Sequence, residues 1–133
     1  MDIEEIFEKT TLVIENSCGI PAKDINLDDT LFNKLEIDSL DLVDILFDLE
    51  SIFEVQLKIS DLELKTRNAL KGKPFEVNGE ITTEGLVALK EFMNEVDPNH
   101  FVEGLTIYEL SKLFTVKSLC KLVQYKLQEK KEN

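Results

Sequence analysis

The sequence has few of the residues on which several classes of protein depend. It holds 2 cysteines, 1 histidine and no tryptophan among 133 residues. Cys18 and Cys120 are too few and too far apart in the sequence for a disulfide framework or a zinc site, so we expect both to be reduced, and buried rather than reactive. His100 stands beside a proline-containing turn, and no pattern links it to a nucleophile. We therefore predict neither catalytic residues nor a metal site.

Long apolar segments and glycine-rich loops are also missing. The 5 glycines form no phosphate-binding loop, and no apolar run is long enough to cross a membrane. Residues 1–5 are acidic where a secretory signal would be basic, so we expect a cytoplasmic protein. Asp24, Asn26 and Asp28 have the opening spacing of a calcium loop, but Leu35 stands where that loop needs glutamate. An EF-hand is therefore not predicted.

Basic residues are scarce, and the acidic residues are concentrated in one half of the chain. The formal net charge is −12, from 27 Asp and Glu against 15 Lys and Arg. Residues 1–64 hold 17 acids and 4 bases, a net charge of −13, whereas residues 65–133 hold 10 acids and 11 bases, a net charge of +1. A surface this negative repels nucleic acid and anionic lipid but speeds encounters with proteins that carry basic patches. We expect basic protein partners, with neither nucleic-acid binding nor membrane insertion.

An acidic amphipathic helix is predicted to begin at Ser39. Asp38 is a good N-cap, and Asp41 occupies the third helical position of a capping box. Apolar residues then recur every three or four positions and predict a stripe that faces the core: Leu42, Ile45, Leu46, Leu49, Ile52 and Phe53. Leu40, Val43 and Phe47 lie near the edge of this stripe among carboxylates, which favours docking onto a basic groove of a partner.

The same reasoning predicts helices over most of the chain, and therefore an all-α fold. The expected helices cover about 2–16, 39–53, 60–70, 86–96, 106–113 and 115–130, with a long loop over 18–37. Ser60 with Glu63, and Thr106 with Glu109, match capping boxes, and Thr115 is expected to cap the last helix. Residues 75–77 fit a short strand, but so few residues are not expected to make a sheet.

These features resemble the acyl carrier protein family. That family has an Asp-Ser-Leu triplet at the start of its second helix, matched here by Asp38, Ser39 and Leu40. Its helix ends in Leu-Glu and a phenylalanine, as Leu49, Glu50 and Phe53 do here. Residues 25–35 are similar to the long first loop of the family, and residues 114–123 to the opening of its last helix. The resemblance covers residues 1–60 and 114–130.

The sequence departs from the family pattern in two places. Glu36 stands two residues before the aspartate of the triplet, where the family usually has glycine, so the backbone there must suit a residue with a side chain. Roughly fifty residues separate Ser60 from Phe114, where compact members have one short helix and a turn. We expect an acyl-carrier-like four-helix bundle with one or two extra helices inserted before the last helix. The predicted unit is a single carrier domain over 1–133, with an insertion at about 62–113.

The resemblance implies a carrier and not an enzyme. A phosphopantetheinyl transferase would attach 4′-phosphopantetheine from coenzyme A to Ser39, and the arm would hold an acyl group as a thioester. Acyl-loading, condensing and acyltransferase enzymes are the further partners that it implies. The docking residues that we predict are Glu36, Asp38, Leu40, Asp41, Asp44, Phe47, Asp48 and Glu50. An apolar interior could shelter the acyl chain, with Phe7, Phe32, Leu46 and Ile59 as candidate linings or simply core.

Several functions remain open at this point. The favoured one is a monomeric carrier for fatty acid or specialised lipid biosynthesis, including lipid A acylation. Polyketide and aminoacyl carriers are alternatives within the same class. An acidic helical adaptor that binds a basic partner and is never modified is the alternative from another class. The carrier and the adaptor differ in whether Ser39 accepts phosphopantetheine.

Overall fold

The structure is a computed structural model that describes residues 1–58 and 60–132, without the side chains of 62–65. Ile59, one of the candidate acyl linings, therefore lies outside the described residues, as does the side chain of Glu63.

Six α-helices make up most of the described residues, which confirms the all-α prediction. They are α1 (Ile3–Cys18), α2 (Ser39–Phe53), α3 (Asp61–Ala69), α4 (Thr83–Phe92), α5 (Ile107–Ser111) and α6 (Val116–Glu132). Two short 3-10 helices, η1 (Ala22–Asp24) and η2 (Pro98–His100), lie in the connections.

A small β-hairpin interrupts the helical fold. Strands β1 (Glu76–Val77) and β2 (Glu80–Ile81) pair antiparallel, with Glu76 opposite Ile81 and Val77 opposite Glu80. The expectation that residues 75–77 make no sheet was wrong, because Asn78 and Gly79 both adopt positive φ and close a two-residue turn between the strands.

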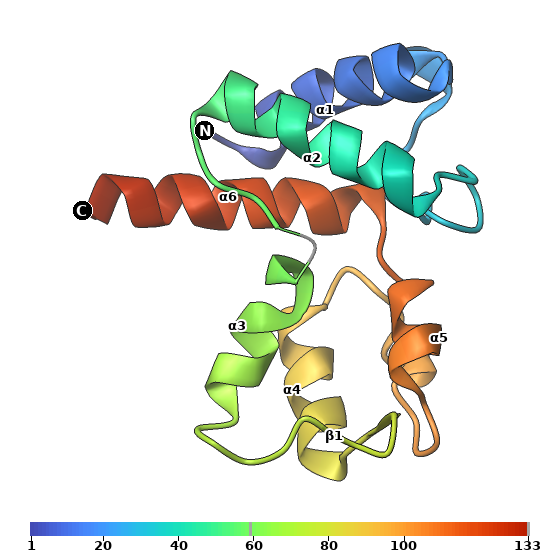
Figure 1. Ribbon diagram of the computed structural model, residues 1–133, viewed down its shortest axis with the longest axis vertical. Coiled ribbons are helices and arrows are strands. Elements are labelled where there is room, and N and C mark those ends of the chain that lie inside the picture. Colours follow the sequence, from blue (N-terminus) through green and yellow to red (C-terminus); the bar gives the residue numbers. More distant parts are fainter. Residues whose placement is uncertain (59, 133) are drawn as a thin grey trace.

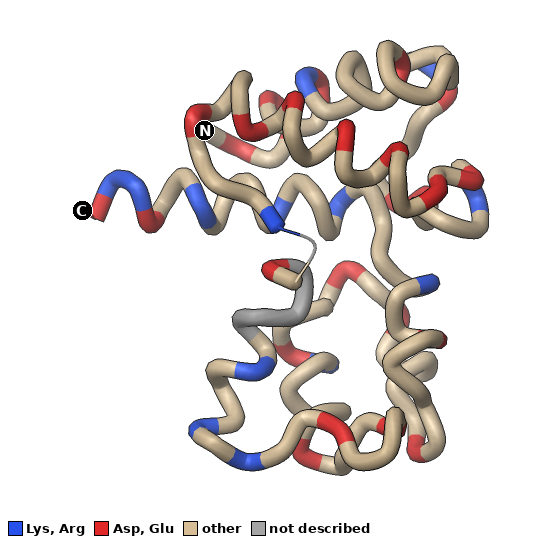
Figure 2. The backbone as a smooth tube through the Cα atoms, viewed as in Figure 1, with Lys and Arg blue, Asp and Glu red and all other residues tan. Residues whose placement is uncertain are grey.

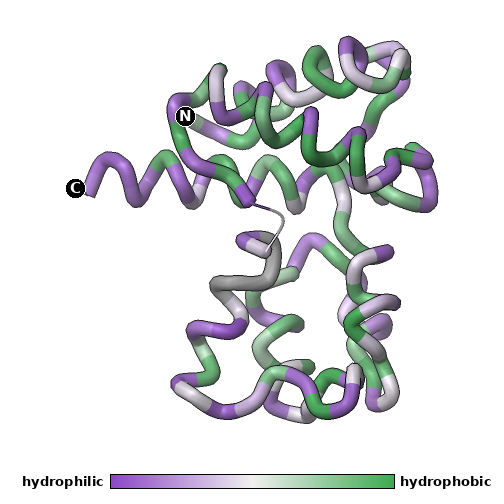
Figure 3. The backbone as a smooth tube through the Cα atoms, in the orientation of Figure 1, coloured by the Kyte–Doolittle hydropathy of each residue, from purple (hydrophilic) through white to green (hydrophobic). Residues whose placement is uncertain are grey.

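Helix α6 runs across the middle of the molecule and separates two groups of elements (Figure 1). Helices α1 and α2 lie on one side of it, and α3, α4, α5 and the hairpin lie on the other. Helix α6 packs against α1, α2 and α3, so it is shared by both groups. Along α1, α2 and α6 hydrophobic and hydrophilic residues alternate with the helical period (Figure 3). The arrangement confirms a carrier-like helical bundle with additional helices placed before the last one.

The predicted core stripe of α2 is confirmed except at one position. Leu42, Ile45, Leu46, Leu49 and Phe53 are all buried. Ile52, in contrast, is 45% exposed, so its predicted inward position was wrong. Ile52 belongs to the last turn of α2, where Phe53 takes the buried place.

Most of the predicted helix caps are confirmed. The Thr106 hydroxyl accepts from the backbone N–H of Glu109 at 3.1 Å, and the Thr115 hydroxyl accepts from that of Ser118 at 3.2 Å. The predicted cap at Ser60 was wrong, because its side chain makes no capping hydrogen bond to α3. The carboxylate of Asp61 instead accepts from the backbone N–H of Lys58 at 2.9 Å, which closes the turn before the helix.

Backbone hydrogen bonds tie the long loop before α2 to the start of α6. The Leu31 N–H donates to the Phe114 carbonyl at 2.9 Å, and the Val116 N–H donates to the Asp29 carbonyl at 3.0 Å. Thr30 and Thr115 form an antiparallel bridge between these two bonds. The segment that leads to Ser39 is therefore fixed against the junction of α5 and α6.

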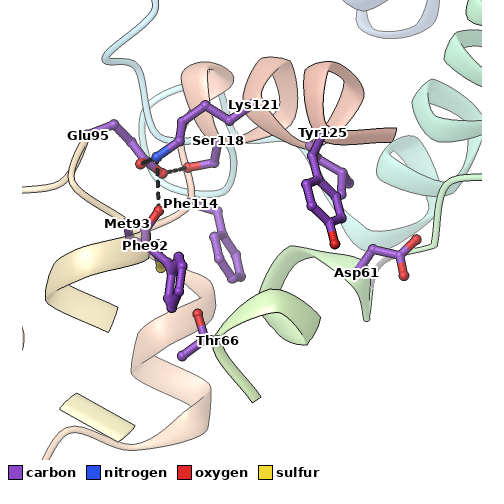
Figure 4. A pocket seen from close by; sticks show the side chains of 10 residues that line it. Asp61, Thr66, Phe92, Met93, Glu95, Phe114, Ser118, Lys121 and Tyr125 are labelled. Carbon is purple, nitrogen blue, oxygen red and sulfur yellow. Dashed lines mark hydrogen bonds and ion pairs between the residues drawn. The ribbon is translucent and has the colours of Figure 1, made fainter. Parts of the chain in front are cut away.

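A second junction joins the end of α4 to α6 through a polar cluster of Glu95, Ser118 and Lys121 (Figure 4). Lys121 forms an ion pair with Glu95 and also donates to the Phe92 carbonyl at 2.9 Å. The Ser118 hydroxyl donates to the second oxygen of Glu95 at 2.6 Å, and the Glu95 side chain is only 3% exposed. These residues border a small cavity of about 90 Å³ between α3, α4 and α6. The cluster holds the inserted helices on α6.

Candidate functional site

Ser39 is the first residue of α2, and its side chain is exposed. The Asp38 carboxylate accepts from the backbone N–H of Asp41 at 2.8 Å, and the Asp41 carboxylate accepts from the backbone N–H of Asp38 at 3.5 Å. The predicted capping box is therefore confirmed. Because these two aspartates cap the helix, the Ser39 hydroxyl is not needed for capping and stands at the positive end of the helix dipole.

Glu36 adopts the left-handed backbone conformation, with φ of 53°. This conformation favours glycine, because a Cβ atom crowds the following carbonyl oxygen. The residues around it are held firmly: the Leu35 N–H donates to the Thr30 carbonyl at 3.1 Å, and the Ile37 N–H donates to the Leu31 carbonyl at 3.0 Å. The position thus requires the backbone that glycine adopts most easily, while the sequence supplies glutamate.

The acidic residues of the first half gather on α1, α2 and the loop before α2 (Figure 2). Their field reaches Cys18 at the end of α1. Partial burial, followed by the negative charges of Asp41, Asp38 and Asp44, raises the pKa of the Cys18 thiol above its ordinary value. Cys120 is fully buried, and its burial raises its pKa to about 11. Both thiols are free. The expected burial is confirmed for Cys120 but was wrong for Cys18, which is only partly buried at the end of α1.

One side of α2 presents apolar side chains among carboxylates. Leu40, Val43 and Phe47 are 78%, 51% and 66% exposed. All but two of the carboxylates predicted for docking are exposed as well: Glu36, Asp38, Asp44 and Asp48. Asp41 is half-buried by its capping role. Glu50 is also half-buried, because its carboxylate accepts from the backbone N–H of Leu57 at 2.9 Å, so it holds the chain that follows α2.

A groove of about 440 Å³ adjoins Ser39. Its lining combines residues near the start of α2 with residues of α5 and the segment after it: Phe32, Ser39, Leu42, Tyr108, Ser111, Lys112 and Phe114. Of the candidate acyl linings, Phe32 lies in this groove. Leu46 does not, because it borders a separate groove beside Val43 and Phe47. Phe7 packs against the buried core.

Sequence reasoning missed the side of the groove formed by α5. Tyr108 and Lys112 are separated from Ser39 by about seventy residues, and helical periodicity gives no information about contacts over that distance. The one available signal is their position directly before the segment 114–123, which resembles the opening of the family's last helix.

Within residues 1–58 and 60–132, no helix has the length and apolar character needed to span a bilayer. Over the same described residues, no three His, Cys, Asp or Glu side chains are grouped so that they could hold a metal ion.

Comparison with known proteins identifies the family. The family described as "Phosphopantetheine attachment site" matches residues 2–72, more than half of the chain. The acyl carrier protein of Thermotoga maritima is 40% identical over 60 residues, which cover 45% of this chain and 74% of that protein. The acyl carrier protein of Saccharopolyspora erythraea is 40% identical over 63 residues, 47% of this chain and 66% of that protein. That of Streptococcus pneumoniae is 34% identical over 61 residues, 46% of this chain and 80% of that protein.

The family match contains α1, the long loop, α2 and α3, and it ends before the hairpin. The group that the family attaches is 4′-phosphopantetheine, and the exposed serine at the start of α2 lies inside the matched segment. The chain therefore belongs to the acyl carrier protein family, whose members are phosphopantetheine-bearing carriers and not enzymes.

Proposed function

We propose that Ser39 is the residue of this carrier that receives 4′-phosphopantetheine. The observation that supports the proposal is its exposed hydroxyl at the first position of α2, inside the segment that matches the family. A phosphate on this hydroxyl faces the positive end of the helix dipole, which stabilises it by about 0.3–1 kcal/mol at an exposed site. The carboxylates of Glu36, Asp38 and Asp41 oppose it. The transferase must therefore supply cations of its own.

The attachment step uses the Ser39 hydroxyl as nucleophile and coenzyme A as the donor of the group. The serine oxygen bonds to the phosphorus that carries the pantetheine, the bond from that phosphorus to adenosine 3′,5′-bisphosphate breaks, and the hydroxyl proton passes to a base of the transferase. Once bound, the group supplies a thiol that holds an acyl group as a thioester. Asp38 and Asp41 keep Ser39 at the exposed end of α2 by capping the helix around it.

We propose that partner enzymes dock on the exposed side of α2. The surface combines the apolar side chains of Leu40 and Phe47 with the carboxylates of Asp44 and Asp48. Basic patches on a phosphopantetheinyl transferase, or on acyl-loading, condensing and acyltransferase enzymes, match it in charge. Because these groups are exposed, the attraction weakens when salt shortens the screening length to about 8 Å or less. Glu50 contributes less, since it is bonded to the backbone of Leu57.

We further propose that residues 1–133 act as one monomeric, cytoplasmic carrier domain in fatty acid or specialised lipid biosynthesis, including lipid A acylation. The return of α6 to pack on α1 and α2 supports a single unit with an insertion over about 62–113. The inserted α4, α5 and hairpin favour a dedicated pathway, because they add surface beyond the segment that matches the family. Two free cysteines are typical of proteins in reducing compartments.

The intact mass of the purified protein tests the attachment residue. The protein is incubated with coenzyme A, magnesium and a broad-specificity phosphopantetheinyl transferase. Wild type is expected to gain the mass of one phosphopantetheine group, and Ser39→Ala is expected to gain none while its circular dichroism spectrum stays unchanged. Ser51→Ala is the matched control, since Ser51 is also an exposed serine of α2. A mass gain by Ser39→Ala, or none by wild type with several transferases, contradicts the proposal.

A further inference from the structure

The groove beside Ser39 is built from two parts of the chain that the backbone holds in a fixed relation. Phe32 and Leu42 form the wall near the start of α2, and Tyr108, Lys112 and Phe114 form the opposite wall. The hydrogen bond from Leu31 to the Phe114 carbonyl joins the two walls directly. Leu42 and Phe114 are buried, so each wall of the groove has a firmly packed apolar side chain. Its volume of about 440 Å³ lies within the range of about 300–1,000 Å³ of small-molecule sites.

Lys112 brings a positive charge to the groove. Among the residues that line the groove in the described part of the chain, it is the one with a cationic side chain. Its ammonium lies over the ring of Tyr108, 4.5 Å from the ring centroid. A cation held in this way keeps its charge at a defined place with less freedom than a solvated lysine. The groove thus combines apolar walls with one positioned cation and a serine hydroxyl.

We propose that Lys112, positioned by Tyr108, binds the phosphodiester of the arm on Ser39, and that the apolar walls of the groove hold the pantetheine part that follows. The inference rests on the proposed attachment at Ser39 and adds a binding residue from outside the segment that matches the family. The occupant is tethered at the groove itself, so its local concentration is high without any further contact. Charge complementarity selects the phosphate for Lys112, because the other charged groups at the start of α2 are carboxylates: Glu36, Asp38 and Asp41.

The proposal predicts that attachment of the arm stabilises wild type more than it stabilises a variant without the cation. The melting temperatures of the apo and holo forms are measured for wild type, Lys112→Gln and Lys112→Arg at low salt. The melting temperature of the holo form minus that of the apo form is expected to be about 1–4 °C larger in wild type than in Lys112→Gln. This is the effect expected of one partly exposed ion pair on the melting temperature of a domain of this length. Lys112→Arg keeps the charge and is expected to retain most of the difference.

Lys90→Gln serves as the matched control, because Lys90 is an exposed lysine of the inserted α4 that does not line the groove. Its holo-minus-apo difference is expected to equal that of wild type. In 0.5 M salt the advantage of wild type over Lys112→Gln is expected to shrink, because screening weakens an exposed pair. The comparison uses differences between two forms of one variant, so any direct effect of the substitution on apo stability cancels.

Amide NMR shifts give an independent readout of the same contact. Conversion of apo to holo protein is expected to shift the amides of Tyr108 and Lys112, although about seventy residues separate them from Ser39, and to leave that of Lys90 in place. The inference is overturned if the holo-minus-apo melting difference is equal in wild type and Lys112→Gln, or if the amides of Tyr108 and Lys112 do not shift. In that case a mass gain would still support attachment at Ser39. Absence of any mass gain in wild type overturns the proposed function, and this inference with it.

Discussion

Replacement of Glu36 by glycine is expected to stabilise the protein. Glu36 has φ of 53°, where a side chain costs about 1–2 kcal/mol that glycine avoids. Glycine also gives the unfolded chain more freedom, which offsets about 0.4–1 kcal/mol of this gain. The net increase in the free energy of unfolding is about 0.5–1 kcal/mol. For a domain of this length, the melting temperature is expected to rise by about 2–5 °C.

Glu36→Gln separates the backbone contribution from the charge. Glutamine keeps a side chain at the same φ and removes the charge beside Asp38, so its expected effect stays within about 0.5 kcal/mol of wild type. Thermal unfolding of the apo forms, followed by circular dichroism, is measured at low and high salt. The advantage of Glu36→Gly over Glu36→Gln is expected to persist at high salt, because backbone strain is not screened. A glycine variant that melts at or below the glutamine variant refutes the reasoning.

Two other regions give predictions that are independent of modification. Lys121→Met removes the cation that pairs with the carboxylate of Glu95, whose side chain is only 3% exposed. The free energy of unfolding, measured in urea, is expected to fall by about 3 kcal/mol. Lys130→Met is the control, because Lys130 is 52% exposed in its ion pair. This substitution is expected to lower the free energy of unfolding by less than about 0.5 kcal/mol. Equal losses for the two variants would contradict the role of the cluster. In the native protein, Cys18 is expected to react with an alkylating reagent before the fully buried Cys120. Burial, and then the acidic neighbours, raise the pKa of Cys18, so added salt is expected to speed its reaction by screening the second contribution. Prior labelling of Cys120, detected by peptide mass spectrometry, would contradict this order.

The features that the sequence predicted well depend on residues close to one another in the chain. The capping box of Asp38 and Asp41 and the caps at Thr106 and Thr115 follow from residue type and a spacing of three, so they are readable without a structure. The same rule failed at Ser60, where the turn is closed by another side chain. The attachment role of Ser39 comes from the resemblance to the family, whose motif is also local, and it stays a prediction.

The contacts that surround the site are long-range, and local patterns do not specify them. Glu95 and Lys121 pair across 26 residues, and the groove joins Ser39 to Lys112. Periodicity shows which face of a helix is apolar but not which other helix covers it. The left-handed backbone at Glu36 is an intermediate case, since the usual glycine of the family indicated the conformation while the glutamate itself gave no sign of it.

The inserted helices change the surroundings of Ser39 without changing the helix that carries it. Helix α2 has its own cap and its own buried stripe, so its first turn does not depend on the insertion. The wall formed by α5 does depend on it, because the Ile107 N–H donates to the Gly79 carbonyl at 2.9 Å and Ile81 donates to the Leu105 carbonyl at 2.9 Å. The hairpin thereby supports the segment that presents Tyr108. A carrier with the same α2 but a compact connection would retain Ser39 and lose these hairpin supports, so the proposed attachment at Ser39 and the proposed binding of the arm by Lys112 are separable.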